Sequence, residues 1–375
     1  MTLSFGIFDH VDRGAGTLAE FYENRLKLIE AYDRAGFYIY LVAEHHMTPL
    51  GMAPSPSVFL SAVAQRTKRL RFGPLVYTLP LYHPLRLVEE ICMLDQMSGG
   101  RLEFGVGKGI SPIENGYYGL DPANAEKMFA EALEVLLMGL AGGRVSFSGA
   151  FYRFEDVPME LEPLQKPRPP LWYGANNPQS AERCARRGMN VVANAPAKVL
   201  RGMGEAYWPL AKHAAAPSSR QSESEGGEYP ARQTESGRAG RSRSALASAA
   251  SAKLGMNRHI VIAEDGAEAL AVARRAYRRW YASFMKLWRE HNIPPVSVNY
   301  PPEIDGFIEN GLAVVGTPAE VRAILEAQLA ESGVNYLGCR FAFGDLSLAE
   351  SVRSVDLFAR EVMPYLRAVP RAAAE

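Results

Sequence analysis

The sequence predicts a (β/α)8 barrel, the TIM-barrel fold, formed as one domain by the whole chain, residues 1–375. Short apolar segments alternate with amphipathic stretches almost without exception, and eight such pairs can be counted. Eight βα units in a chain of this size are typical of the barrel, whose catalytic residues follow the carboxyl ends of the strands. A doubly wound open sheet is the structural alternative.

The eight strand candidates are mostly short and apolar, and glycine, proline or polar residues bound them, as is usual for buried parallel strands. Amphipathic stripes between them predict the helices that return the chain to the same end of the sheet. In chain order the strand candidates are Leu3–Phe8, Phe37–Ala43, Leu70–Tyr77, Leu102–Val106, Leu171–Gly174, Asn190–Ala193, His259–Ala263 and Tyr336–Phe341.

Three segments do not fit a bare barrel. The sequence of Val145–Phe154 predicts a small hairpin decoration. His213–Lys253 (213–253) contains no Ile, Val, Phe, Trp or Met, which predicts a disordered, solvated low-complexity insertion; its Arg and Ser could also indicate an RNA-binding tail, but Glu residues dilute the charge. Arg289–Gly311 (289–311) carries four prolines, which exclude a helix or central strand there and predict a mobile active-site lid.

Composition narrows the class of function. Lys and Arg total 41 and so do Asp and Glu, so no basic excess is available for nucleic acid or a membrane surface. The three cysteines are widely spaced, which disfavours a disulfide framework and a zinc site. Without a signal sequence or an apolar run long enough to span a membrane, the sequence predicts a cytoplasmic protein that acts on small molecules.

Ionisable residues follow the second predicted strand. Glu44, His45 and His46 stand in succession at the position where barrel enzymes keep catalytic groups. Metal binding is disfavoured, because adjacent residues on a strand point to opposite faces and the HExxH spacing is absent. A hydrogen-bonded structural histidine remains the alternative to a catalytic one.

Two further segments suggest a ligand that carries a phosphate. Glycines surround Lys108 at the end of the fourth strand without matching a dinucleotide or P-loop motif, so they favour close approach of a planar ligand with Lys108 beside an anion. After the fifth strand, Asn177 precedes Pro178 at a helix start, where Asn177 and Ser180 could bind a phosphate. Simple capping of the helix by Asn177 is the alternative.

Five segments in this order together resemble the bacterial luciferase-like, flavin-dependent monooxygenases. The resemblance covers nearly the whole chain except 213–253. The segments are AEHH at 43–46, the block at 73–109, GANNPQSAERCARRG at 174–188, VGTPAEV at 315–321 and LFAREVMPYL at 357–366.

The resemblance implies a TIM barrel that binds reduced FMN and assigns roles to individual residues. His45 matches a histidine that assists the oxygen chemistry of the flavin. Lys108 replaces an arginine that pairs with the FMN phosphate. Gly107 stands where luciferase proper has a reactive cysteine, which puts light emission in doubt. The remaining matched positions are Asn177 and Ser180, at the phosphate, and Leu75 and Val76, which carry a non-proline cis peptide under the flavin.

The function implied is that of an FMN-dependent monooxygenase, an oxidoreductase that acts on paired donors with incorporation of molecular oxygen. A separate flavin reductase would supply reduced FMN, dioxygen would form a flavin hydroperoxide, and a small, largely apolar organic substrate would be oxygenated. The protein would be a homodimer or pair with a related subunit. Two alternatives remain, a deazaflavin-dependent hydride-transfer oxidoreductase and a non-catalytic flavin-binding partner subunit.

Overall fold

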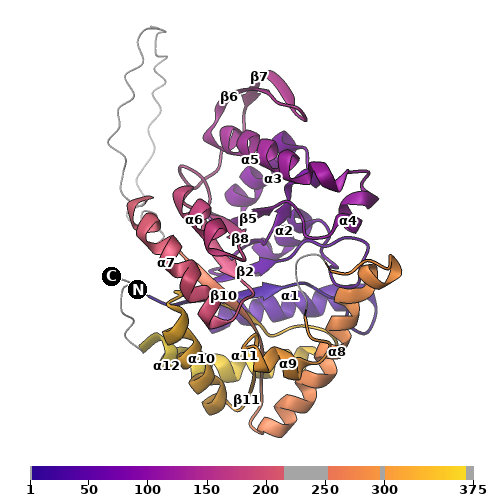
Figure 1. The fold of residues 1–375 in the computed structure, drawn as a ribbon, viewed down its shortest axis with the longest axis vertical. Coiled ribbons are helices and arrows are strands. Elements are labelled where there is room, and N and C mark those ends of the chain that lie inside the picture. Colours follow the sequence, from indigo (N-terminus) through magenta and orange to yellow (C-terminus); the bar gives the residue numbers. More distant parts are fainter. Residues whose placement is uncertain (1, 215–251, 296–299, 369–375) are drawn as a thin grey trace.

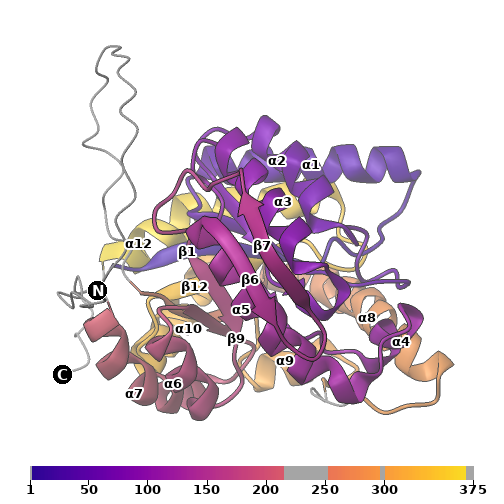
Figure 2. The same cartoon turned by 90° about the horizontal axis from the view of Figure 1, so that it is seen from above.

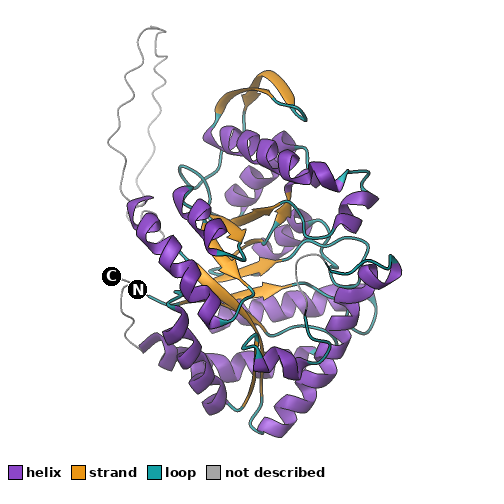
Figure 3. Ribbon diagram, viewed as in Figure 1, coloured by secondary structure: helices purple, strands orange, loops and turns teal. Residues whose placement is uncertain are grey.

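A computed structural model describes residues 2–214, 252–295 and 300–368 of the chain. Parallel strands form a central barrel, and helices surround it (Figure 1). Figure 3 shows the same arrangement by type, with the strands gathered in the middle and most helices outside them. The predicted TIM-barrel fold is therefore confirmed. No helix in the described part of the chain combines the length and apolar character needed to cross a membrane.

All eight predicted strands are present and each is parallel to its neighbours. A bridge between Phe72 and Leu102 joins β3 to β5 and nearly closes the barrel, because β12 pairs with β1 on the other side. Around the barrel, the strands are β1 (Ser4–Asp9), β2 (Ile39–Val42), β3 (Arg71–Pro74), β5 (Phe104–Gly107), β8 (Leu171–Gly174), β9 (Asn190–Ala193), β10 (Leu254–Ile262) and β12 (Tyr336–Arg340).

Local sequence signals begin several of the surrounding helices. Thr17 accepts a hydrogen bond from the backbone N–H of Glu20, whose carboxylate accepts one from the backbone N–H of Thr17, and the same capping box begins α10 and α11. The helices are α1 (Leu18–Ala35), α2 (Pro56–Arg66), α3 (Pro84–Met97), α4 (Pro112–Tyr117), α5 (Ala125–Ala141), α6 (Pro178–Arg186), α7 (Ala197–Ala214), α8 (Gly266–Glu290), α9 (Ile304–Glu309), α10 (Pro318–Ser332), α11 (Leu348–Leu357) and α12 (Met363–Ala368).

Two of the segments outside the bare barrel differ in outcome. The predicted hairpin is confirmed as β6 (Gly143–Ser148) and β7 (Arg153–Met159), which lie beside α5 outside the barrel (Figure 2). In the segment 289–311, the exclusion of a helix is wrong, because α9 begins at Ile304, beyond the last of its prolines. Its role as a lid stays a prediction, and residues 296–299 lie outside the described residues.

The ends of the predicted insertion 213–253 need correction, although residues 215–251 lie outside the described part. Residues 213–214 belong to α7. Lys253 is buried at the start of β10, its ammonium nitrogen 4.6 Å from the centre of the Tyr38 ring, so it is not part of a solvated loop. Composition could not mark the second end, because a lysine does not indicate burial by itself.

A short strand, β11 (Ala313–Gly316), was not predicted. It pairs with the second half of β10, while the first half of β10 pairs with β9. β10 therefore begins earlier than the predicted His259 and is long enough to hold two neighbours on one side. The prolines at 294–302 predicted a loop up to Gly311, so the short apolar run that follows them, at β11, was not assigned to a strand.

Large side chains fill the middle of the barrel. The rings of Trp172 and Tyr336 lie 4.9 Å apart, both fully buried. A Cβ on Gly6 would lie 2.1 Å from the Tyr336 hydroxyl oxygen, and one on Gly255 would lie 2.3 Å from Tyr336 Cδ1, so β1 and β10 need glycine at these positions. Side chains alternate along a strand, so Phe8, two residues after Gly6, and Arg340, four residues after Tyr336, also face the inside of the barrel. Both lie nearer its carboxyl end.

A buried carboxylate holds the amino-terminal end of the barrel together. Glu103 is fully buried, and its carboxylate accepts hydrogen bonds from the Trp172 indole N–H (2.6 Å), the Tyr38 hydroxyl and the Arg71 guanidinium. The three donors and Glu103 itself come from four different parts of the barrel wall. Removing the acceptor would leave them without a partner in a region that excludes water.

We expect Glu103→Ala to lower the free energy of unfolding by about 3–5 kcal/mol, as found when one partner of a buried ion pair is removed. Urea unfolding followed by circular dichroism measures this. Glu182→Ala is the matched control, since Glu182 pairs with Arg186 on the surface, where such pairs contribute little. Equal effects of the two substitutions would show that Glu103 does not hold the barrel.

Candidate active site

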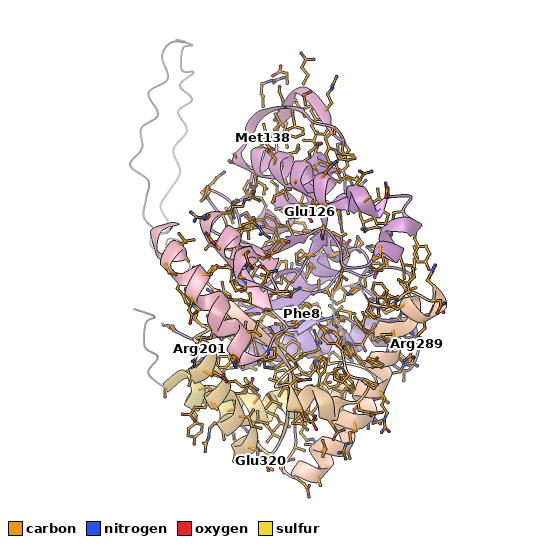
Figure 4. All side chains as sticks on the ribbon, viewed as in Figure 1. Phe8, Glu126, Met138, Arg201, Arg289 and Glu320 are labelled. Atoms are coloured by element: carbon orange, nitrogen blue, oxygen red, sulfur yellow. The ribbon has the colours of Figure 1, made fainter. Side chains whose placement is uncertain are left out.

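A cavity of about 320 Å³ lies at the carboxyl ends of the barrel strands. Residues at or after the ends of β1, β2, β3, β5, β8 and β9 line it, together with Asn257 of β10, two aromatic residues of α8, Trp280 and Phe284, and Tyr300. Phe8, one of its lining residues, is labelled near the centre of the molecule in Figure 4, whereas Arg201, Arg289 and Glu320 lie on outer helices. The cavity thus occupies the position where barrel enzymes carry out catalysis.

His45 lies in the wall of this cavity and is held by a carboxylate. Its Nδ1 is 3.2 Å from Glu114 Oε1 of α4. Burial disfavours the protonated ring, but the charge of Glu114 and its hydrogen bond outweigh burial and raise the pKa of His45 above its usual value. Because Glu114 takes Nδ1, the Nε2 atom is the one left to exchange a proton with a ligand.

His46 points away from the cavity, as the alternation of side chains predicts. Its Nε2 lies 2.9 Å from Glu44 Oε1, its Nδ1 lies 2.9 Å from the Tyr118 hydroxyl, and its backbone N–H donates to Glu114 Oε2 (3.0 Å). Glu44 also accepts a hydrogen bond from the Tyr82 hydroxyl at 2.7 Å. His46 is therefore a structural residue that fixes the loop on which His45 stands.

No metal site is visible in this region. Among the described residues, no group of three or more histidine, cysteine, aspartate or glutamate side chains is placed to hold a metal ion. The carboxylates of Glu44 and Glu114 are each paired with the ring of a different histidine.

The Leu75–Val76 peptide bond is cis, as the resemblance implied, and both residues line the cavity. The glycines of β5 adapt to this turn. A Cβ on Gly105 would lie 2.9 Å from the Pro74 carbonyl oxygen, and one on Gly107 would lie 2.7 Å from Val76 Cγ2. These glycines are therefore needed by the neighbouring turn itself, which also explains why position 107 has no larger side chain.

Of the three predicted phosphate residues, only Lys108 lines the cavity. It is exposed and forms an ion pair with Glu126 at 2.8 Å. Asn177 caps α6 by accepting a hydrogen bond from the Ser180 backbone N–H at 2.9 Å, so the capping interpretation is correct. Asn176, rather than Asn177 or Ser180, is the residue of this segment that lines the cavity.

The sequence analysis missed a buried polar cluster that adjoins His45, in which the His10 ring lies 5.5 Å from the His45 ring and 5.9 Å from that of Trp280. The Trp280 indole N–H donates to His10 Nδ1 at 3.2 Å, and the Arg340 Nη1 lies 2.7 Å from His259 Nε2. Burial, followed by the charge of Arg340, lowers the pKa of both His10 and His259 well below the usual value, so both rings are neutral. Position just after or within a strand was the signal available for these residues.

The similarity of this chain to known proteins covers most of its length. A profile of the family described as luciferase-like monooxygenase matches residues 3–336. The protein y4wF of Sinorhizobium fredii is 42% identical over 364 residues, 96% of each chain. The oxygenase component of the flavin-dependent trigonelline monooxygenase of Acinetobacter baylyi is 30% identical over 193 residues, 50% of this chain and 53% of that protein.

Solved structures share the barrel. The monooxygenase RslO1 of Streptomyces bottropensis has a TM-score of 0.77 at 25% identity, with 97% of this chain and 99% of that chain covered. At 19% identity, the oxygenating constituent of 3,6-diketocamphane monooxygenase of Pseudomonas putida, in complex with FMN, reaches 0.70 with 97% and 99% covered. The coenzyme F420-dependent tetrahydromethanopterin reductase of Methanopyrus kandleri, also at 19%, reaches 0.64 with 98% and 100% covered. The profile spans most of the chain, so this chain belongs to the luciferase-like monooxygenase family.

Proposed function

We propose that the protein is the oxygenase component of a two-component, FMN-dependent monooxygenase. The observation that carries this proposal is the cavity itself, with the Leu75–Val76 cis peptide in its wall, His45 paired with Glu114 in that wall and Lys108 at its rim. A relative named as an oxygenase component supports a separate flavin reductase as the partner. The expected dimer and cytoplasmic location stay predictions.

The residues present fit a bound FMN. Leu75, Val76 and Val106 offer an apolar wall for a planar ring, and Lys108 offers a cation for a phosphate. Asn177 already satisfies the Ser180 N–H, but the start of α6 still has other backbone donors and its dipole. Reduced FMN, when bound, would supply the electrons that activate dioxygen.

The protein's own part is to orient, to exclude water and to move a proton. Trp280, Phe284 and Tyr300 cover one side of the cavity with aromatic surface, which limits water around a reacting group. His45 is fixed through Nδ1 by Glu114, so its other ring nitrogen can give or take a proton at a defined place. This pairing also argues against a non-catalytic subunit, which would need no oriented acid or base.

A second candidate is a hydride-transfer enzyme that uses a deazaflavin. The F420-dependent relative with the same barrel favours it. The two functions differ in cofactor and in their need for dioxygen. We expect the protein to bind reduced FMN more tightly than reduced F420 in anaerobic titrations.

On mixing with dioxygen, the protein should also change the oxidation kinetics of reduced FMN relative to free reduced FMN. Tighter binding of F420, together with FMN oxidation that the protein does not alter, would replace the monooxygenase proposal by the hydride-transfer one. Both measurements need only the purified chain and the two cofactors, so they precede any search for a substrate.

Lys108→Ala should weaken FMN binding by about 1.5–3 kcal/mol, the usual contribution of a hydrogen bond to a charged group. Isothermal titration calorimetry with FMN measures this. Lys166→Ala is the matched control, because Lys166 is an exposed lysine in a comparable ion pair, with Glu162. An FMN affinity unchanged in Lys108→Ala would mean that the phosphate binds elsewhere.

His45→Ala should keep the fold and the FMN affinity, and it should slow the protein-dependent reaction of bound reduced FMN with dioxygen by about 10²- to 10⁴-fold, the usual effect of losing a positioned acid or base. Stopped-flow absorbance measures the rate. Wild-type rates in His45→Ala would remove this residue from the mechanism.

Glu114→Gln tests the same assignment through pH. Without the carboxylate, burial and the charge of Arg340 are opposed only by the charge of Glu44, so the pKa of His45 falls. The limb of the pH profile that reports His45 should therefore move to lower pH, whether the ring acts as an acid or as a base. A limb that stays in place or moves to higher pH would contradict the role of Glu114 as the positioning residue.

A further inference from the structure

Arg340 is a buried cation whose hydrogen bonds are incomplete. Arg340 is the last residue of β12, and it is 4% exposed. Nη1 meets the neutral ring of His259 at 2.7 Å, but Nε and Nη2 have no hydrogen-bond partner and no contact with water. Among the described residues, no carboxylate lies within ion-pair distance of it.

The surroundings of Arg340 compensate its charge only in part, through the Phe8 and Trp280 rings and through acidic groups beyond ion-pair distance. The nearest acidic groups that act on it are Asp12 and Asp9. Asp9 is engaged by Arg25 at 3.2 Å. Burial raises the pKa of Asp12 to about 7, so this carboxyl is neutral in part of the molecules at neutral pH. An arginine is costly to bury without a partner, so its presence here calls for an anion.

The guanidinium lies directly behind the cavity wall. Its carbon is 4.8 Å from the centre of the Phe8 ring and 5.7 Å from that of Trp280, and both rings line the cavity. Arg340 also lines a pocket of about 10 Å³ whose walls include Asn194, Asn257 and Tyr300. The same three residues line the main cavity, so the small pocket adjoins it, and its volume is about that needed for one water-sized group such as one carboxylate oxygen.

We propose that Arg340 binds a carboxylate of the organic substrate, so that the substrate has an apolar body in the main cavity and an anionic end in the small pocket. This inference rests on the proposed function and names the substrate class for the same site. Guanidinium and carboxylate pair through two parallel hydrogen bonds, which would use the donors that Arg340 leaves free. Asn257, whose Oδ1 also lacks a partner, can turn its amide to add an N–H.

Benzoate and its neutral isostere benzamide are suitable probes, because they differ in the charge of one group. Titrated calorimetrically into the full chain without FMN, benzoate should bind about tenfold or more tightly than benzamide. Arg340→Met should abolish this preference, and Arg340→Lys should restore part of it. A preference that survives in Arg340→Met would overturn the proposal.

Two controls separate this site from other cations. Lys108→Ala should keep the preference for benzoate; its loss there, with retention in Arg340→Met, would assign the anion to Lys108 and refute the proposal. Arg25→Met replaces a buried arginine that has its carboxylate partner, so it should lower the melting temperature and keep the preference. Arg340→Met should not lower the melting temperature, because it removes an unpaired buried charge; a drop as large as that of Arg25→Met would indicate a structural role instead.

The benzoate titrations test the anion site separately from the proposed FMN site. If FMN fails to bind but benzoate binding still depends on Arg340, the proposed function fails and the anion site stands. If Arg340→Met leaves benzoate binding unchanged but weakens the binding of reduced FMN, the guanidinium faces the cofactor and the substrate assignment is wrong.

Discussion

The structure depends on how Tyr336 fills the centre of the barrel. Its ring occupies the space that Gly6 and Gly255 leave open, and it packs against Trp172. Because β12 closes the barrel between β1 and β10, this one ring sets how closely three strands approach. With the middle filled in this way, polar residues below it gather on Glu103, and the carboxyl end above it remains open for a ligand.

At that open end, two adjacent histidines are each held by a different carboxylate. Glu114 holds the ring of His45 at the cavity, whereas Glu44 holds the ring of His46, which does not line it. The ring of each histidine is thus fixed in orientation. Burial lowers the pKa of His45 and Glu114 raises it, so the ring can still gain or lose a proton. Arg340 and two neutral histidines form a second polar region, and the ring of one of them, His10, lies 5.5 Å from that of His45, so the two regions meet in the cavity wall.

Sequence patterns predicted the barrel because its strands are buried on both sides and therefore read as short apolar runs. They also singled out His45, since a strand end followed by ionisable residues has a known place in this fold. The structure puts His45 in the cavity wall, and its catalytic role stays a prediction. They missed Glu114 and Arg340, which meet the site through contacts between residues distant in sequence, and β11, which follows a proline-rich stretch that was predicted to be a loop. The phosphate role of Asn177 and Ser180 stays a prediction, because capping explains the contact that the structure shows between them.

A crystal structure of the protein with bound FMN tests the central claim most directly, that the cavity at the strand ends is a flavin site. The account predicts the isoalloxazine ring against the Leu75–Val76 peptide, within reach of His45, with the phosphate beside Lys108 and the start of α6, and with Arg340 free of the cofactor. A phosphate at Arg340, or a flavin bound outside the cavity, would contradict it.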